Sequence, residues 1–163
     1  MEILKFPHPH LMSKTEEVTV FGPELKTLLD AMWETLSSKG AVGLAANQVG
    51  LTQRMFVMEG PNGERINAIN PTILFKSAAF ANLKEGCLSA PGDFVIVPDR
   101  ALWVQMRYRD EHGNTQIRVL DGLYGVCVQH EIDHLDGKAY LENKSIPRST
   151  RKNLAKKWGL KLK

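Results

Sequence analysis

The residues most able to do chemistry are two histidines, His130 and His134, with Glu131 directly after the first. Residues four apart on a helix share one face, so both imidazoles can reach one metal ion. Glu131 lies beside them and can take a proton from a water bound to that metal. The H-E-x-x-H spacing therefore predicts a metal-dependent hydrolase. The alternative is a pair of helix-face histidines bonded only to backbone or solvent.

Two histidines do not complete a catalytic metal site, which usually has three protein ligands and one position for water. No histidine follows His134, and Tyr140 stands where a metzincin has its third histidine. Glu142 is a possible ligand but lies very close in sequence, just past the expected helix end. These residues leave the third ligand open.

The two cysteines are the other candidates. Cys127 precedes His134 by seven residues, a helical rise of about 10.5 Å, so the two are poorly placed to share one ion. We expect Cys127 to pack as a small apolar side chain. Cys87 lies in a separate segment, and its residue type alone allows either a metal ligand or a buried structural thiol.

Hydrophobic spacing predicts the elements that position these residues. It favours a helix over 23–39 and a second helix that Asp121 can cap and Gly137 ends. Strands are expected at 54–59, 66–75, 94–97, 102–109 and 115–120, the last two as a hairpin. A last helix is expected at 149–158, with Ser149 as a possible cap.

Because the strands come in runs and do not alternate with helices, the sequence predicts an α+β fold. Antiparallel or mixed β-sheets would pack around a central helix that bears the H-E-x-x-H motif. An N-terminal helix and a short basic C-terminal helix complete this prediction.

The composition bounds the class of protein. The 163 residues, 43% hydrophobic and 24% charged, suit one catalytic domain over 1–163. No apolar stretch is long enough to span a bilayer, and no signal or transit pattern is seen. Two cysteines cannot form a disulfide scaffold. We therefore expect a cytoplasmic protein with reduced thiols, no membrane partner and a monomeric state.

The charge is unevenly distributed. Residues 143–163 hold eight basic side chains and no acidic one, while the rest of the chain holds 13 basic and 18 acidic residues. Such a basic tail can be drawn to a polyanion such as ribosomal RNA. A solvated last helix with a frayed end is the alternative. Trp158 is the only aromatic residue there, so no dedicated nucleic-acid site is expected.

Three blocks of the sequence together resemble the peptide deformylase family. They are Gly43-Leu44-Ala45-Ala46-Asn47-Gln48, Glu85-Gly86-Cys87-Leu88-Ser89, and the stretch from Gln129 to Gly137, in the family's order and spacing. The resemblance covers about residues 2–145. One position departs from the family pattern, since Ala41 stands where the first block normally begins with glycine. An extra methyl there crowds the turn if φ is positive.

This resemblance implies removal of the formyl group from the N-terminal formyl-methionine of nascent polypeptides, with release of formate. It implies Cys87, His130 and His134 as ligands of one divalent metal. In the family this metal is usually Fe²⁺ in the cell, so the resemblance implies Fe²⁺ here, with Zn²⁺, Ni²⁺ or Co²⁺ able to occupy the site.

The resemblance also implies roles for the catalytic residues. Glu131 would act as general acid and base while metal-bound hydroxide attacks the formyl carbon. The Gln48 side-chain amide and the Leu88 backbone N–H would hold the oxyanion that forms.

Substrate binding follows from the same resemblance. An extended peptide would add as a strand along Val42, Gly43 and Gly86. The methionine pocket would be walled by Val42, Leu123, Val126, Cys127 and the ring of His130. Arg100 resembles a family arginine near the peptide path. Core packing is the alternative for the wall residues, and a solvated position at the start of a strand is the alternative for Arg100.

Two other function classes remain open. A metallopeptidase could use the same H-E-x-x-H motif on internal peptide bonds, although the missing downstream histidine counts against it. A ribosome- or RNA-binding module with a structural metal would want a fourth protein ligand and would have no use for Glu131 or Gln48. The basic tail could also dock an active enzyme at the ribosome, where formylated chains emerge.

Overall fold

The computed structural model describes residues 1–162, which form three α-helices, three short 3-10 helices (η) and seven strands. In chain order these are η1 (Pro9–Met12), α1 (Pro23–Lys39), β1 (Gly43–Ala45), η2 (Ala46–Val49), β2 (Met55–Glu59), β3 (Arg65–Lys76), β4 (Lys84–Cys87), β5 (Ala90–Ile96), β6 (Trp103–Arg109), β7 (Thr115–Asp121), α2 (Gly122–Leu135), η3 (Tyr140–Glu142) and α3 (Arg148–Trp158).

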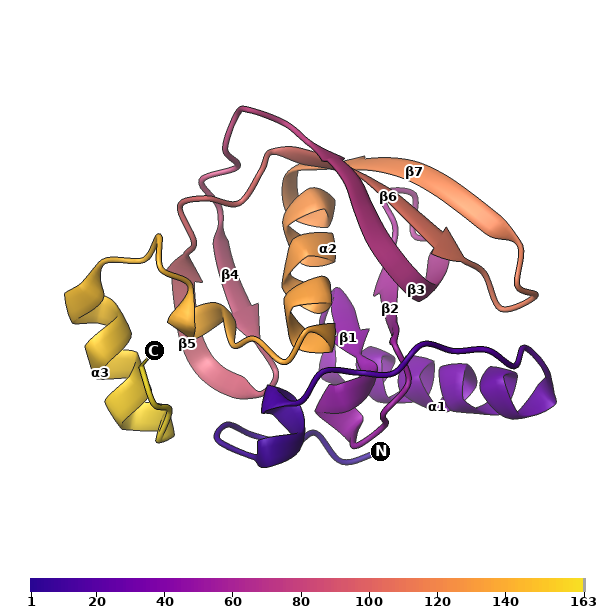
Figure 1. Ribbon diagram of the computed structural model, residues 1–163, viewed down its shortest axis with the longest axis horizontal. Helices are drawn as coiled ribbons and strands as arrows, with labels where there is room; N and C mark the ends of the chain where they lie inside the picture. The colour runs from indigo at the N-terminus through magenta and orange to yellow at the C-terminus, as the bar shows by residue number, and fades with distance from the viewer. Residues whose placement is uncertain (163) are drawn as a thin grey trace.

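Two antiparallel sheets enclose one helix. The larger sheet has the order β1-β2-β3-β6-β7, and the smaller one is the hairpin β4-β5. Figure 1 shows α2 between the two sheets, with α1 beneath the larger sheet and α3 beyond the β4-β5 hairpin. The predicted α+β arrangement around a central helix is confirmed, and both sheets are antiparallel rather than mixed.

Strand alternation places the core as expected. In β6, Val104, Met106 and Tyr108 are buried toward α2, whereas Trp103 stays 38% exposed. Since successive side chains of a strand point to opposite faces, β6 turns one face to α2 and the other to solvent. On β1 and β2 the face away from α2 packs against α1. The sequence did not indicate β1 and β4, which are only three and four residues long.

The helices begin and end close to their predicted bounds. Helix α1 spans the predicted 23–39 and ends at Gly40, whose φ of 62° is the left-handed conformation that glycine tolerates best. Asp121 holds the N-cap position of α2, but its side chain makes no capping hydrogen bond. The prediction of Ser149 as the cap of α3 is wrong, because Pro147 takes that position and its carbonyl accepts from the Arg151 N–H at 3.0 Å.

The C-terminal segment packs against the body over its described residues. Ala155 and Leu160 are buried in a cluster with residues of η1, β5 and η3. Helix α3 is therefore not solvated all round, although its lysines do face solvent. No helix in residues 1–162 is both long and apolar enough to cross a membrane.

Candidate metal centre

Helix α2 and the end of β4 bring three possible metal ligands together. Cys87, His130 and His134 each offer one ligand atom, and these atoms lie within 4.8 Å of one another. Cys87 Sγ lies 3.2 Å from His134 Nε2. The three side chains are buried or nearly so. The cysteine that the sequence left undecided therefore lies beside both histidines of the motif.

A buried charged network orients His130. Its Nδ1 lies 2.9 Å from Glu85 Oε1 and donates to that carboxylate, which leaves Nε2 with its lone pair for an ion. Arg100 holds Glu85 with two hydrogen bonds, from Nε at 2.9 Å and Nη2 at 2.7 Å. Its Nη1 also reaches Asp133 Oδ2 at 2.7 Å. Burial alone would raise the pKa of Glu85, but the hydrogen bonds from Arg100 and His130 outweigh it and lower that pKa.

The burial of Arg100 excludes the solvated position that was the alternative to a substrate role. The side chain is nearly fully buried and bonded to two carboxylates, and it does not line the cavity described below. Arg100 therefore reaches the ring of His130 only through Glu85, and its role toward a peptide stays a prediction. Sequence reasoning missed Glu85 and Asp133 as its partners, because no spacing along the chain connects them to Arg100.

Gln48 presents its amide nitrogen to the sulfur of Cys87. Its Oε1 accepts from the Ala45 N–H at 3.0 Å, which turns Nε2 toward Cys87 Sγ at 3.4 Å and Ser89 Oγ at 3.1 Å. The Ser89 N–H also donates to Cys87 Sγ at 3.4 Å. The contacts of the Gln48 amide with Ala45, Cys87 and Ser89 are all buried, so they hold the amide group in one orientation. Leu88 lies in the turn beside it and lines the same cavity.

Glu131 is a buried carboxyl group, and one of its oxygen atoms has no hydrogen-bond partner among the described residues. It is 4% exposed, and the oxygen without a partner is Oε2. Burial raises its pKa to about 7, with the nearby His130 opposing the rise. A carboxyl group with a pKa near neutrality can both accept and return a proton at physiological pH.

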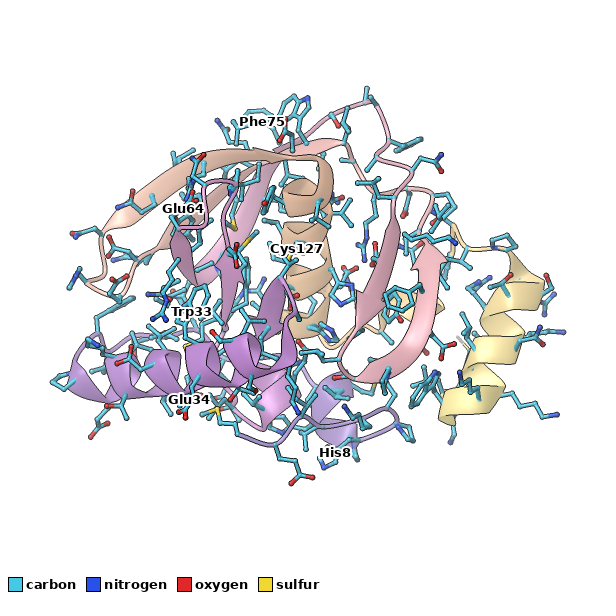
Figure 2. All side chains as sticks on the ribbon, turned by 180° about the vertical axis from the view of Figure 1, so that it is seen from behind. His8, Trp33, Glu34, Glu64, Phe75 and Cys127 are labelled. Carbon is cyan, nitrogen blue, oxygen red and sulfur yellow. The ribbon has the colours of Figure 1, made fainter. Side chains whose placement is uncertain are left out.

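Strand β1 passes so close to α2 that a side chain at Gly43 would displace groups on that helix. A Cβ at Gly43 would lie 2.7 Å from both Glu131 Oε1 and Cys127 Sγ. Figure 2 shows Cys127 on α2 next to that strand. Cys127 joins the apolar core as expected, and burial raises the pKa of its thiol. The φ angle of Ala41 is not positive, so the methyl group of this alanine does not strain the turn.

A cavity of about 470 Å³ opens onto these groups. Its lining includes Gln48, Cys87, Leu88, His130 and Glu131. The predicted substrate residues Val42, Gly43, Gly86, Leu123, Val126 and Cys127 also line it. A larger cleft of about 780 Å³ lies along Lys14 and Arg107 and holds none of the predicted catalytic residues.

The N-terminal segment ties two parts of the site together. The Leu4 N–H donates to the Gln48 carbonyl at 2.8 Å, and the Phe6 N–H donates to the Ser89 carbonyl at 3.0 Å. The Phe6 ring stacks on His134 with a centroid distance of 6.2 Å. Asn47 donates from its side chain to the carbonyl of His134. These contacts, which the sequence did not reveal, hold the first block against α2.

The residues present fit a divalent metal. A thiol sulfur and two imidazoles converge, the outer nitrogen of His130 is tied to a carboxylate, and Glu131 Oε2 is buried without a partner among the described residues. Such a donor set suits soft-to-borderline metals. An H-E-x-x-H helix joined by a cysteine from a neighbouring hairpin defines a class, that of the metal-dependent hydrolases.

Comparison with known proteins narrows this class to one family. The model of the polypeptide deformylase family matches residues 1–150, and the chain belongs to that family. It is accordingly a hydrolase of protein biosynthesis, of a family whose members depend on a metal. The match ends within α3, so most of the C-terminal segment lies beyond it.

Individual relatives agree with this assignment. Peptide deformylase 1 of Shewanella oneidensis is 40% identical over 144 residues, 87% of this chain and 84% of that protein. The solved structure of Thermus thermophilus peptide deformylase has a TM-score of 0.86 at 35% identity, covering 95% of this chain and 90% of that one. The Synechococcus elongatus peptide deformylase in complex with actinonin has a TM-score of 0.89 at 30% identity, covering 99% and 87%.

Proposed function

We propose that this protein, acting as a single catalytic domain, removes the formyl group from the N-terminal formyl-methionine of nascent polypeptides and releases formate. One observation carries the proposal. Cys87, His130 and His134 converge beside the buried carboxyl group of Glu131, at a cavity of about 470 Å³. A cavity of this size takes a methionine side chain together with its formyl group.

Cys87, His130 and His134 would hold the metal, which we propose to be Fe²⁺, with Zn²⁺, Ni²⁺ or Co²⁺ as possible replacements. When bound, a divalent ion supplies a Lewis acid that activates water and polarises the formyl oxygen. Glu85 and Arg100 support this ligand set, because they fix the ring of His130.

Glu131 moves the proton. Its free Oε2 accepts a proton from the attacking water and later delivers it to the departing amine nitrogen. The pKa of about 7 matches both steps.

Gln48 and Leu88 stabilise the charge that develops on the formyl oxygen. The Gln48 Nε2 already points into the site, and the Leu88 backbone N–H lies in the adjoining turn. Donors aimed in advance at such an oxygen contribute on the order of 3 kcal/mol each to catalysis.

Strand β1 offers an edge for the peptide. It is the outermost strand of the larger sheet, so one side of its backbone is free to pair with an added strand. A peptide that runs between Gly43 and Gly86 would place the methionine side chain against Val42, Val126 and Cys127. Leu123 would close this pocket toward solvent.

Formate release tests the proposal. Protein loaded anaerobically with Fe²⁺ or Ni²⁺ would be given a short formyl-methionyl peptide, with Glu131→Ala measured in parallel. We expect rapid release by the wild type and a loss of about 10²–10⁴-fold in the variant at unchanged metal content. Near-normal release by Glu131→Ala would remove its assigned role, and casein cleavage without formate release would favour a peptidase.

A further inference from the structure

Two apolar side chains that line the cavity are exposed to solvent. Exposed positions of a protein are more often polar, so this pair is unusual. Phe94 on β5 is 67% exposed, and Leu123 in the first turn of α2 is 49% exposed. Both line the cavity that contains Glu131 and Cys87. They come from β5 and α2, two of the elements that line this cavity, so a peptide leaving it can contact them.

Gly86 fixes the ring of Phe94 in this place. A Cβ on Gly86 would lie 2.5 Å from Phe94 Cε1, so the ring occupies the space beside this glycine. One side of the ring covers the backbone of β4, which leaves the remainder to the cavity and solvent. An aromatic ring over a strand glycine also stabilises a hairpin, so a purely structural role for Phe94 is the alternative to test.

The charged side chains of the cavity divide by depth. Lys39 and Lys84 are exposed at its rim, whereas Glu85 and Glu131 are buried at its inner end. The rim is therefore apolar and positively charged. Such a surface favours apolar side chains of a bound peptide and disfavours basic ones.

We propose that Phe94 and Leu123 form an apolar rim that selects formyl-methionyl peptides whose next residues are apolar. This inference rests on the proposed function, because the formyl group must lie at Glu131 for the following residues to reach the rim. An extended peptide advances about 3.3 Å per residue, so the one or two residues after methionine lie where the cavity opens. Their apolar side chains contact the exposed part of the Phe94 ring.

The test is the ratio of kcat/KM values for formyl-Met-Leu-Leu and formyl-Met-Gly-Gly, measured by formate release with the metal-loaded enzyme. The wild type prefers the leucine peptide, and formyl-Met-Lys-Lys is its poorest substrate. Phe94→Ala lowers the leucine-to-glycine ratio roughly fivefold, the effect of losing a contact of about 40 Å² of apolar surface. Leu123→Ala changes the ratio in the same direction.

Phe75→Ala is the matched control. Phe75 is 65% exposed, nearly the same as Phe94, but it lies on β3 and does not line the cavity. Figure 2 shows Phe75 at the top of the molecule, near the end of β3 and away from Cys127. Its replacement leaves the ratio and both kcat/KM values unchanged.

The possible results distinguish failure of the selectivity proposed for Phe94 and Leu123 from failure of the proposed deformylase function. A ratio that stays constant in Phe94→Ala, while both peptides still release formate, overturns the inference and assigns Phe94 to covering Gly86. If Phe94→Ala does not fold, Leu123→Ala alone decides by the same ratio. No formate from any peptide with the wild type overturns the proposed function, and the inference with it.

Discussion

The ionisable side chains of helix α2 are mostly buried, whereas those of helix α3 are mostly exposed. In α2, His130, Glu131 and His134 are buried, and Asp133 is bonded to the buried Arg100. In α3, only Ala155 is buried, and the basic side chains face solvent or pair at the surface. The principal polar tether of α3 is Asp93, which accepts from Lys157 at 2.9 Å and from the Trp158 indole.

This difference teaches where a charge matters. A buried charge that loses its partner is left without solvation, which costs several kcal/mol. An exposed charge is solvated and screened, so its removal changes folding little but changes attraction to other molecules. We therefore expect substitutions around α2 to alter stability and chemistry, and those on α3 to alter association.

Arg100→Met should have the largest effect. It leaves Glu85 buried and loosens the ring of His130, so we expect about 3–5 kcal/mol of lost stability and about 10–100-fold weaker metal binding. Urea unfolding and metal titration measure these. Arg54→Met is the matched control, since the Arg54–Asp136 pair at 2.8 Å is partly exposed. Equal losses in both variants would contradict the contrast between buried and exposed charge.

Gly43→Ala should affect activity more than stability. The added methyl would lie 2.7 Å from Glu131 Oε1, so the carboxyl group must move away. A displaced catalytic group costs on the order of 10²-fold in rate, which formate release would show. Gly22→Ala, with nothing within 4 Å of the added Cβ, should keep full activity. Normal turnover by Gly43→Ala would show that Glu131 need not keep its place.

Asp93→Asn should have a small, pH-dependent effect on stability. The hydrogen bond from Lys157 lowers the pKa of Asp93 from its ordinary value of 3.8, against the opposing effect of burial. A lowered carboxyl pKa stabilises the fold above the ordinary value, and this contribution disappears as pH falls through the folded-state pKa. We expect a loss of up to about 1 kcal/mol at pH 7. Thermal unfolding should show the two proteins converging in acid; a gap that widens there would contradict the assignment.

Charge reversal on α3 should leave the enzyme itself nearly unchanged. Lys152 and Lys156 are exposed, so Lys152→Glu with Lys156→Glu should change unfolding free energy by less than about 0.5 kcal/mol. If α3 contacts ribosomal RNA, the double variant loses salt-sensitive co-sedimentation with ribosomes. Reversal of Lys14 and Lys76 is the control. Unchanged binding would contradict the ribosome contact that the basic tail predicts.

The sequence predicted the helices and strands better than the side-chain contacts between them. Helical spacing predicted α1 and α2, and alternation predicted β6 and β7, because these signals lie within one short segment. The bonds from Arg100 to Glu85 and Asp133 span 15 and 33 residues, and no local pattern encodes them. Phe94 looked like an ordinary strand residue until the β4-β5 pairing placed its ring beside Gly86.

The contacts of Leu4 and Phe6 can form only after distant parts of the chain have been synthesised. These residues bond to Gln48 and Ser89, and Phe6 stacks on His134, so the site joins segments from opposite ends of the chain. At about 5–20 residues per second, the early segment waits on the order of ten seconds for α2 to emerge. A chain still in synthesis therefore cannot complete the candidate metal centre until α2 has emerged and packed against this segment.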